Sequence, residues 1–182
     1  MVFIHGFTGG EDTWKNSNNQ GFKDILNHDS DLSSQYEFYE FEYYTKLTSL
    51  LDSVLIQRTK LLLNKLPFLN LNSRVRKNKP IAQLSDILGT YLRTSLSQHD
   101  EVILVGHSMG GLVAKACILN SLDDGSSPKV KGYVSVAVPH KGSIGAQLIS
   151  LSQNVNAKEL KPLSEYNDQL NSEWTDRKEE LP

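Results

Sequence analysis

Residues 101–115 read EVILVGHSMGGLVAK, and this stretch decides the fold. Its first part, Glu101 to Val105, is a short apolar run typical of a strand buried in a parallel sheet. The run leads directly into GHSMG at residues 106–110, which matches the pattern G-x-S-x-G, and an apolar helical stretch from Leu112 to Leu122 follows. A G-x-S-x-G pattern between a strand and a helix predicts a sharp turn that exposes the serine hydroxyl at the end of the sheet.

Ser108 is therefore the predicted nucleophile. Gly106 and Gly110 have no side chains to collide across the turn, and the helix that follows directs its positive N-terminal end towards developing negative charge. His107 occupies the variable position of the pattern and is expected to pack beside the nucleophile. A chance meeting of small residues is the alternative, which the flanking strand and helix disfavour. A P-loop is excluded because no Lys-Ser/Thr follows in register.

A second motif, HGFTGG at residues 5–10, follows the apolar run Met1 to His5. Acyl transfer creates an oxyanion that needs two backbone N–H donors. In folds with this serine turn, one donor belongs to the residue after the nucleophile, here Met109, and the other to a loop after an early strand. We assign the second donor to Phe7, in the loop that His5 and Gly6 open. Alone, a His-Gly pair at a strand end would indicate only a turn.

A third motif, Pro139-His140-Lys-Gly-Ser, ends the strand predicted after the nucleophile helix. Doubly wound sheets place their sites at the carboxyl ends of strands, so His140 is expected near the pocket. The usual order of a triad along the chain is Ser, Asp/Glu, His. The only carboxylates between Ser108 and His140 are Asp123 and Asp124. Both aspartates follow the far end of the nucleophile helix. We therefore favour a pocket-lining role for His140 over the alternative of a general base.

The remaining chain alternates strand-like and helical patterns. The predicted strands are Met1–His5, Tyr36–Tyr44, Glu101–Val105 and Lys131–Val138, and the predicted helices are Phe22–Leu26, Leu47–Leu66, Ile81–Leu96 and Leu112–Leu122. From Gly142 the pattern is helical and polar, with Pro162 as a candidate break. This alternation predicts an α/β fold with a mostly parallel, doubly wound sheet in a single domain over residues 1–182.

Composition limits the function classes. The formal net charge of -2, with 38% hydrophobic and 22% charged residues, is ordinary for a soluble domain and gives no case for nucleic acid as a partner. Cys117 is the only cysteine and is interpreted as a small core residue. No residues have metal-ligand spacing, so no metal or cofactor is expected. A basic cluster at residues 74–79 is interpreted as a solvated loop, with contact to an anionic membrane surface as the alternative.

Four segments together resemble a known group of proteins: VFIHGFTGG at residues 2–10, FEYYTK at 41–46, VGHSMGGLVAK at 105–115 and VAVPHKGS at 136–143. They are similar to lipase-like α/β-hydrolases related to the GPI inositol-deacylases and to the serine-active-site-containing (SERAC) proteins. The resemblance implies an α/β-hydrolase fold and a serine esterase or lipase that acts on acyl esters, often lipid-like, through a Ser-Asp-His triad.

The chain departs from the pattern of this group at both ends. It opens on the strand that carries the oxyanion loop and stops at Pro182, so we expect a partial domain, with the catalytic acid and base beyond Pro182 and residues 143–182 as a helical, lid-like region. Two functions follow: a serine ester hydrolase that forms an acyl-enzyme on Ser108, or a non-catalytic binding module of a larger protein. The expected location is the cytoplasm, or an organelle if a targeting segment lies outside this sequence.

Overall fold

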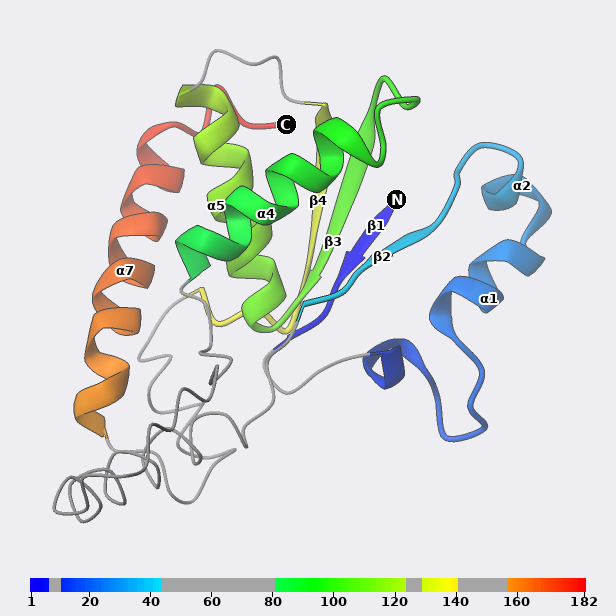
Figure 1. Cartoon of the computed structure of the whole chain (residues 1–182), viewed down its shortest axis with the longest axis horizontal. Coiled ribbons are helices and arrows are strands. Elements are labelled where there is room, and N and C mark those ends of the chain that lie inside the picture. The colour runs from blue at the N-terminus through cyan, green and yellow to red at the C-terminus, as the bar shows by residue number, and fades with distance from the viewer. Residues whose placement is uncertain (7–10, 44–80, 124–128, 141–156) are drawn as a thin grey trace, which may run out of the picture.

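Four parallel strands form one sheet at the centre of the molecule. The computed structural model describes residues 1–6, 11–43, 81–123, 129–140 and 157–182. The strands are β1 (Val2–Ile4), β2 (Tyr39–Phe41), β3 (Val102–His107) and β4 (Val130–Val136), in the spatial order β2-β1-β3-β4 (Figure 1). Every neighbouring pair is parallel. The predicted α/β fold with a parallel sheet is confirmed.

The strand order creates a switch point between β1 and β3. From β1 the chain passes to β2 on one side of it, and later returns to β3 on the other side. In register, Ile4 at the end of β1 aligns with Phe41 of β2 and with Gly106 of β3. Connections that leave in opposite directions open a crevice at the carboxyl ends of the strands, where doubly wound folds bind their ligands.

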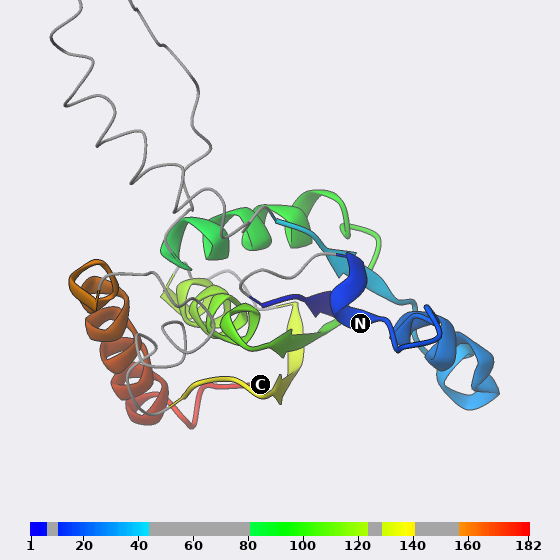
Figure 2. The same ribbon diagram turned by 90° about the horizontal axis from the view of Figure 1, so that it is seen from below.

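Three helices lie on one face of the sheet: α4 (Ile81–Thr94), α5 (Met109–Asp123) and α7 (Ala157–Asp176) (Figure 2). α5 is central, and each of its residues from Met109 to Leu119 is buried. α4 buries a stripe at helical spacing, formed by Ile81, Leu84, Leu88 and Leu92. These residues share one core with Val2 and Ile4 of β1 and with Leu104 of β3.

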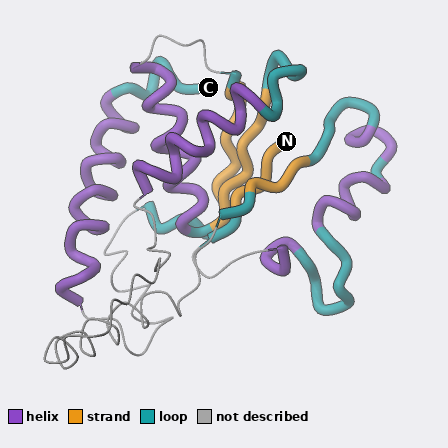
Figure 3. Tube along the Cα trace, viewed as in Figure 1, coloured by secondary structure: helices purple, strands orange, loops and turns teal. Residues whose placement is uncertain are grey.

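The opposite face is covered by the N-terminal segments η1 (Glu11–Trp14), α1 (Phe22–His28) and α2 (Ser30–Ser33), which precede β2 (Figure 3). Phe3 points to this side, because successive strand residues alternate between faces. It forms a second, smaller core with Phe38 and Val105, against which Trp14 and Leu32 pack. This cover reaches over β1 and β3, whereas Val134 and Val136 of β4 remain 48% and 39% exposed on the same face.

Several predicted boundaries are corrected. β2 covers Tyr39–Phe41 rather than residues 36–44, because its described partner β1 is itself only three residues long. The nucleophile helix begins at Met109 rather than Leu112, and β3 runs on to His107. The predicted break at Pro162 is wrong, because α7 is continuous across it. A proline removes one backbone donor, and the packing of α7 on α5 outweighs that loss. The helix predicted over 47–66 lies outside the described residues.

Candidate active site

The turn from β3 into α5 carries Ser108 at the carboxyl end of the sheet. Ser108 has a φ of 52°, in the left-handed region that residues with a Cβ rarely occupy. Its N–H donates to the carbonyl of Val136 on β4 at 3.0 Å, and its own carbonyl accepts from Gly111 N–H at 3.1 Å. Paired strands and a buried helix thus fix the strained turn from both sides, and Ser108 remains only partly buried.

The two glycines of the motif are required by close approach of the backbone. A Cβ on Gly106 would lie 2.4 Å from Gly111 Cα, and one on Gly110 would lie 2.3 Å from the carbonyl oxygen of His5. Both distances are shorter than any carbon–carbon or carbon–oxygen contact can be. The first turn of α5 therefore packs directly against the end of β1.

The loop after β1 lies against the nucleophile. A Cβ on Gly6 would be 2.7 Å from Ser108 Cβ, so the chain can pass here only without a side chain. His5 is buried, with Nδ1 2.8 Å from the Gly6 carbonyl and Nε2 accepting from Tyr43 N–H at 3.2 Å. The Tyr43 ring stacks on the imidazole at 4.2 Å, and its hydroxyl donates to the carbonyl of His5. Both nitrogens of His5 are engaged in holding the loop after β1.

The structure describes one of the two predicted donors of the oxyanion hole. Met109 is the first residue of α5 and is buried, so its N–H has no acceptor within the helix and is available to a ligand. Phe7 lies outside the described residues. Among the residues that the structure does describe, no side chain hydrogen-bonds to Ser108 Oγ.

His107 ends β3, and His140 follows β4. Neither hydrogen-bonds to Ser108 Oγ in the strained turn at residues 106–111, which we call the elbow. Burial lowers the pKa of His107, whose buried Nδ1 has no hydrogen-bond partner among the described residues. The rings of His107 and Trp14 are arranged edge to face, with their centroids 6.1 Å apart. His140 Nε2 lies 2.6 Å from Ser135 Oγ, and burial followed by the charge of Lys115 lowers the pKa of His140. Both rings are therefore neutral at neutral pH.

The other titratable candidates lie far from the elbow. His99 hydrogen-bonds to Tyr39 at the start of β2, which is the opposite end of the sheet from Ser108. Asp123, at the end of α5, forms an ion pair with Arg177. Burial raises the pKa of Cys117 to about 12, so this thiol stays protonated and unreactive. Asp124 and the basic cluster at 74–79 lie outside the described residues.

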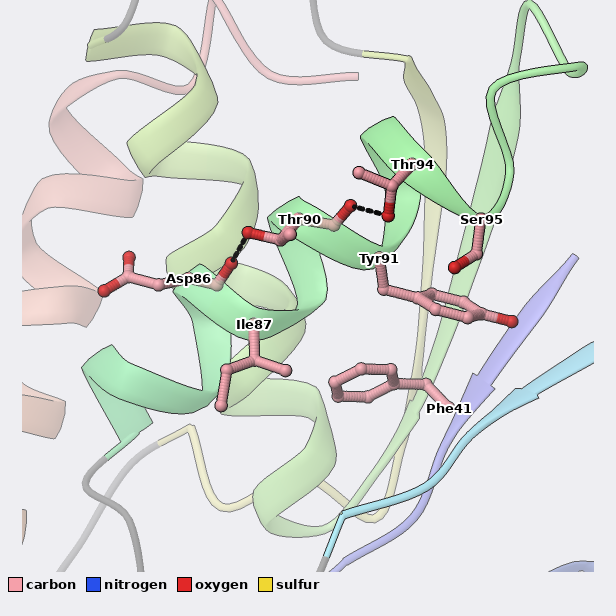
Figure 4. Close-up of a pocket in the computed structure, with 7 residues that line it drawn as sticks. All are labelled: Phe41, Asp86, Ile87, Thr90, Tyr91, Thr94 and Ser95. Carbon is pink, nitrogen blue, oxygen red and sulfur yellow. Dashed lines mark hydrogen bonds between the residues drawn. The ribbon is translucent and has the colours of Figure 1, made fainter.

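Two cavities lined by described residues flank the helical layer. One, of about 320 Å³, lies between α5, β4 and α7. The other, of about 400 Å³, lies between β2 and α4 (Figure 4) and is lined by Phe41, Asp86, Ile87, Thr90, Tyr91, Thr94 and Ser95. The hydroxyls of Thr90 and Thr94 in this second cavity donate to helix carbonyls at 2.9 and 2.8 Å, so they are not free to act on a ligand.

Sequence reasoning missed Tyr43, which fixes the loop after β1, and Lys115, which lines the first cavity. The sequence analysis places Tyr43 only in a predicted strand and Lys115 only in the helix after Ser108.

In the part of the chain that is described, no group of three or more His, Cys, Asp and Glu side chains could hold a metal. No described helix combines the length and apolar character needed to cross a bilayer.

Comparison with known proteins agrees with this architecture. A family model described as PGAP1-like alpha/beta domain matches residues 1–176. The crystal structure of the mature Bacillus licheniformis lipase BlEst2 superposes with a TM-score of 0.52 at 15% identity, over 94% of this chain and 61% of the lipase. At that identity the likeness shows the fold, and the chain spans less than two thirds of the lipase. The predicted α/β-hydrolase fold is confirmed. No curated protein sequence matches the chain.

Proposed function

The chain belongs to the PGAP1-like α/β domain family, and on that premise we propose that it is a carboxylic ester hydrolase with Ser108 as its nucleophile. The observation that carries the proposal is the left-handed conformation of Ser108, with φ 52°, between parallel β3 and buried α5. Strained residues of this kind persist only where the surroundings force them, and they gather at functional sites. The switch point between β1 and β3 is also where a doubly wound sheet places its ligand.

The proposed reaction has two steps. Ser108 Oγ attacks the ester carbonyl carbon, forming a C–O bond while the serine proton passes to a general base. The tetrahedral oxyanion is held by Met109 N–H, with Phe7 N–H as the proposed second donor. Collapse expels the alcohol, which takes up the proton, and leaves an acyl group on Ser108. Water then attacks that acyl group and releases the acid.

Positioning groups are distinct from reacting groups in this proposal. His5 holds the loop after β1 through hydrogen bonds to Gly6 and Tyr43. His140 is engaged with Ser135, and Asn171 donates to its backbone carbonyl. The proposal gives neither histidine the role of general base, and it assigns base and acid to no described residue. The substrate class we propose is an acyl ester, lipid-like in its acyl part.

Ester hydrolysis by a purified protein that carries this chain together with the sequence flanking it in its gene tests the proposal, because the general base and acid are assigned to no described residue. Rates with p-nitrophenyl esters of increasing acyl length are compared between the unsubstituted protein, Ser108→Ala, and Ser97→Ala as the control, because Ser97 is exposed at the far end of the sheet. We expect Ser108→Ala to lower the rate to that of buffer and Ser97→Ala to leave it unchanged. Equal rates in all three proteins, with folding verified by circular dichroism, would favour the non-catalytic binding module.

A further inference from the structure

The cavity between α5, β4 and α7 has a composition unlike that of the elbow. It holds about 320 Å³ and is lined by Lys115, Tyr133, His140, Asn171, Trp174 and Thr175. Lys115 follows Ser108 by two helical turns, which is roughly 10 Å along the axis of α5. Neither Ser108 nor a described residue of the loop after β1 lines the cavity, and the reaction proposed above does not use it.

Lys115 is a buried cation whose described neighbours carry no negative charge. The residue is 4% exposed, its Nζ donates to Asn171 Oδ1 at 2.5 Å, and it lies 5.0 Å from the centroid of the Trp174 ring. No carboxylate among the described residues contacts it. An ammonium has three N–H donors, and burying its charge against neutral groups alone is unfavourable. Lys115 therefore has donor capacity and charge left for a ligand.

The other hydrogen-bond donors around the cavity are already used. Tyr133 donates to the carbonyl of Gly111 at 2.9 Å, and Thr175 donates to the carbonyl of Asn171 at 2.9 Å. Asn171 in turn donates to the carbonyl of His140. The rings of Tyr133 and Trp174 meet edge to face at 5.6 Å and form an apolar wall. One ammonium and two aromatic rings are what the cavity offers to a bound molecule.

We propose that this cavity binds a monoanionic carboxylate attached to an apolar body. The carboxylate pairs with Lys115 Nζ in a charge-assisted hydrogen bond, and the apolar part packs on Trp174 and Tyr133. A single cation matches a single negative charge, whereas a phosphate dianion would leave one charge buried and uncompensated. The volume lies at the small end of the range for ligand pockets, which suits a medium-chain fatty acid. This inference does not rest on the ester-hydrolase proposal.

Binding of a carboxylate depends on the charge of Lys115 and therefore on pH. Burial lowers the pKa of Lys115 from 10.5 to about 8. Facing it are Tyr133 from β4, whose pKa burial raises to about 12, and His140, whose pKa is lowered; α7 contributes Asn171, Trp174 and Thr175, which do not titrate. Lys115 alone changes charge between pH 7 and 10, so carboxylate binding weakens as the pH rises through about 8.

Fluorescence of Trp174 measures the binding directly. Trp14→Phe leaves Trp174 as the single tryptophan of the chain. This protein is titrated with sodium decanoate below its micelle concentration, and in parallel with decanol and with inorganic phosphate. We expect a saturable change with decanoate, and dissociation constants at least about tenfold weaker for decanol and for phosphate. Equal binding of decanol, equal binding of phosphate, or no binding of decanoate would each overturn the proposal.

Substitutions assign the binding to Lys115. In the same background Lys115→Met should weaken decanoate binding at least about tenfold, whereas Lys131→Met, at an exposed lysine of β4, should leave it unchanged. Ser108→Ala should also leave it unchanged, which separates this test from that of the nucleophile. Undiminished binding by folded Lys115→Met would contradict the proposal. If that variant does not fold, the protein that keeps Lys115 is titrated with decanoate at pH 7 and at pH 9.5 instead. A dissociation constant that is the same at both pH values would contradict the proposal.

Discussion

The start and the middle of α5 carry two sites of different origin. At its start, the strained turn at Ser108 is made by six consecutive residues, Gly106 to Gly111, and close backbone approach dictates where glycine must stand, within the turn at Gly106 and against β1 at Gly110. Further along the helix, Lys115 becomes part of a cavity only because α7 and β4 pack beside it. A site built by the local backbone leaves a motif in the sequence, whereas a site built by tertiary packing leaves a single unusual residue.

The largest effect is expected where the backbone leaves no room. Gly106→Ala would place a Cβ 2.4 Å from Gly111 Cα, and neither backbone segment can move without disrupting β3 or α5. We expect the free energy of unfolding in urea to fall by about 3 kcal/mol or more. Gly132→Ala on β4 is the matched control, because its Cβ would meet Ile103 side-chain atoms at an ordinary 3.5 Å. Comparable losses in both variants would show that the turn at Ser108 is not specially constrained.

The cavity should respond to pH where the turn does not. Because the folded protein holds the pKa of Lys115 near 8, below its ordinary value of 10.5, the unfolded chain binds more protons between these values. The penalty of burying the charge is therefore complete below pH 8 and disappears as the pH rises towards 10.5. It amounts to at most about 3.5 kcal/mol, at about 1.4 kcal/mol per pKa unit.

Comparison with Lys115→Met isolates this effect from other titrations. Urea unfolding of both proteins from pH 7 to 10 should show the wild-type chain gaining stability relative to the variant as the pH rises above 8. The difference is needed because burial also raises the pKa of Cys117 to about 12, which lowers stability above pH 9 in both proteins alike. A difference that is independent of pH would mean that Lys115 is not buried as a cation.

The smallest effect concerns strain at Ser108 itself. A residue with a Cβ pays roughly 1 kcal/mol to adopt a left-handed conformation, and glycine does not. Ser108→Gly should therefore be more stable than Ser108→Ala by about 1 kcal/mol, since alanine removes the hydroxyl and keeps the Cβ. Calorimetric melting temperatures of the two variants measure this. A higher melting temperature for the alanine variant would argue against strain at φ 52°.

Sequence reasoning reached the fold and the elbow for the same reason. The apolar run before Ser108 and the glycines around it state local requirements, and β3, α5 and the left-handed serine follow from them. Local signals also caused the errors. Gly110 and Gly111 are poor helix formers, so the helix was predicted to begin at Leu112, although close packing on β1 lets it begin at Met109.

The rest of the site depends on contacts that no local pattern records. Tyr43 reaches His5 only because β1 and β2 pair side by side, and Asn171 reaches Lys115 only because α7 lies on α5. One signal was present for the cavity. Lys115 is the single charged residue in the run from Met109 to Leu119, which is otherwise apolar or small. A lysine inside such a run needs a partner for its charge, because an unpaired buried charge is unfavourable.

The central claim is that the turn at Ser108 holds a reactive hydroxyl, and a fluorophosphonate tests it most directly. The reagent phosphonylates an activated serine, and its phosphoryl oxygen needs the same N–H donors as an oxyanion. After prolonged incubation, peptide mass spectrometry should locate one phosphonyl group on Ser108 in the folded chain. It should find none in Ser108→Ala or in chain unfolded by urea. A folded chain that stays unmodified, or that is modified equally at other serines, would contradict the account.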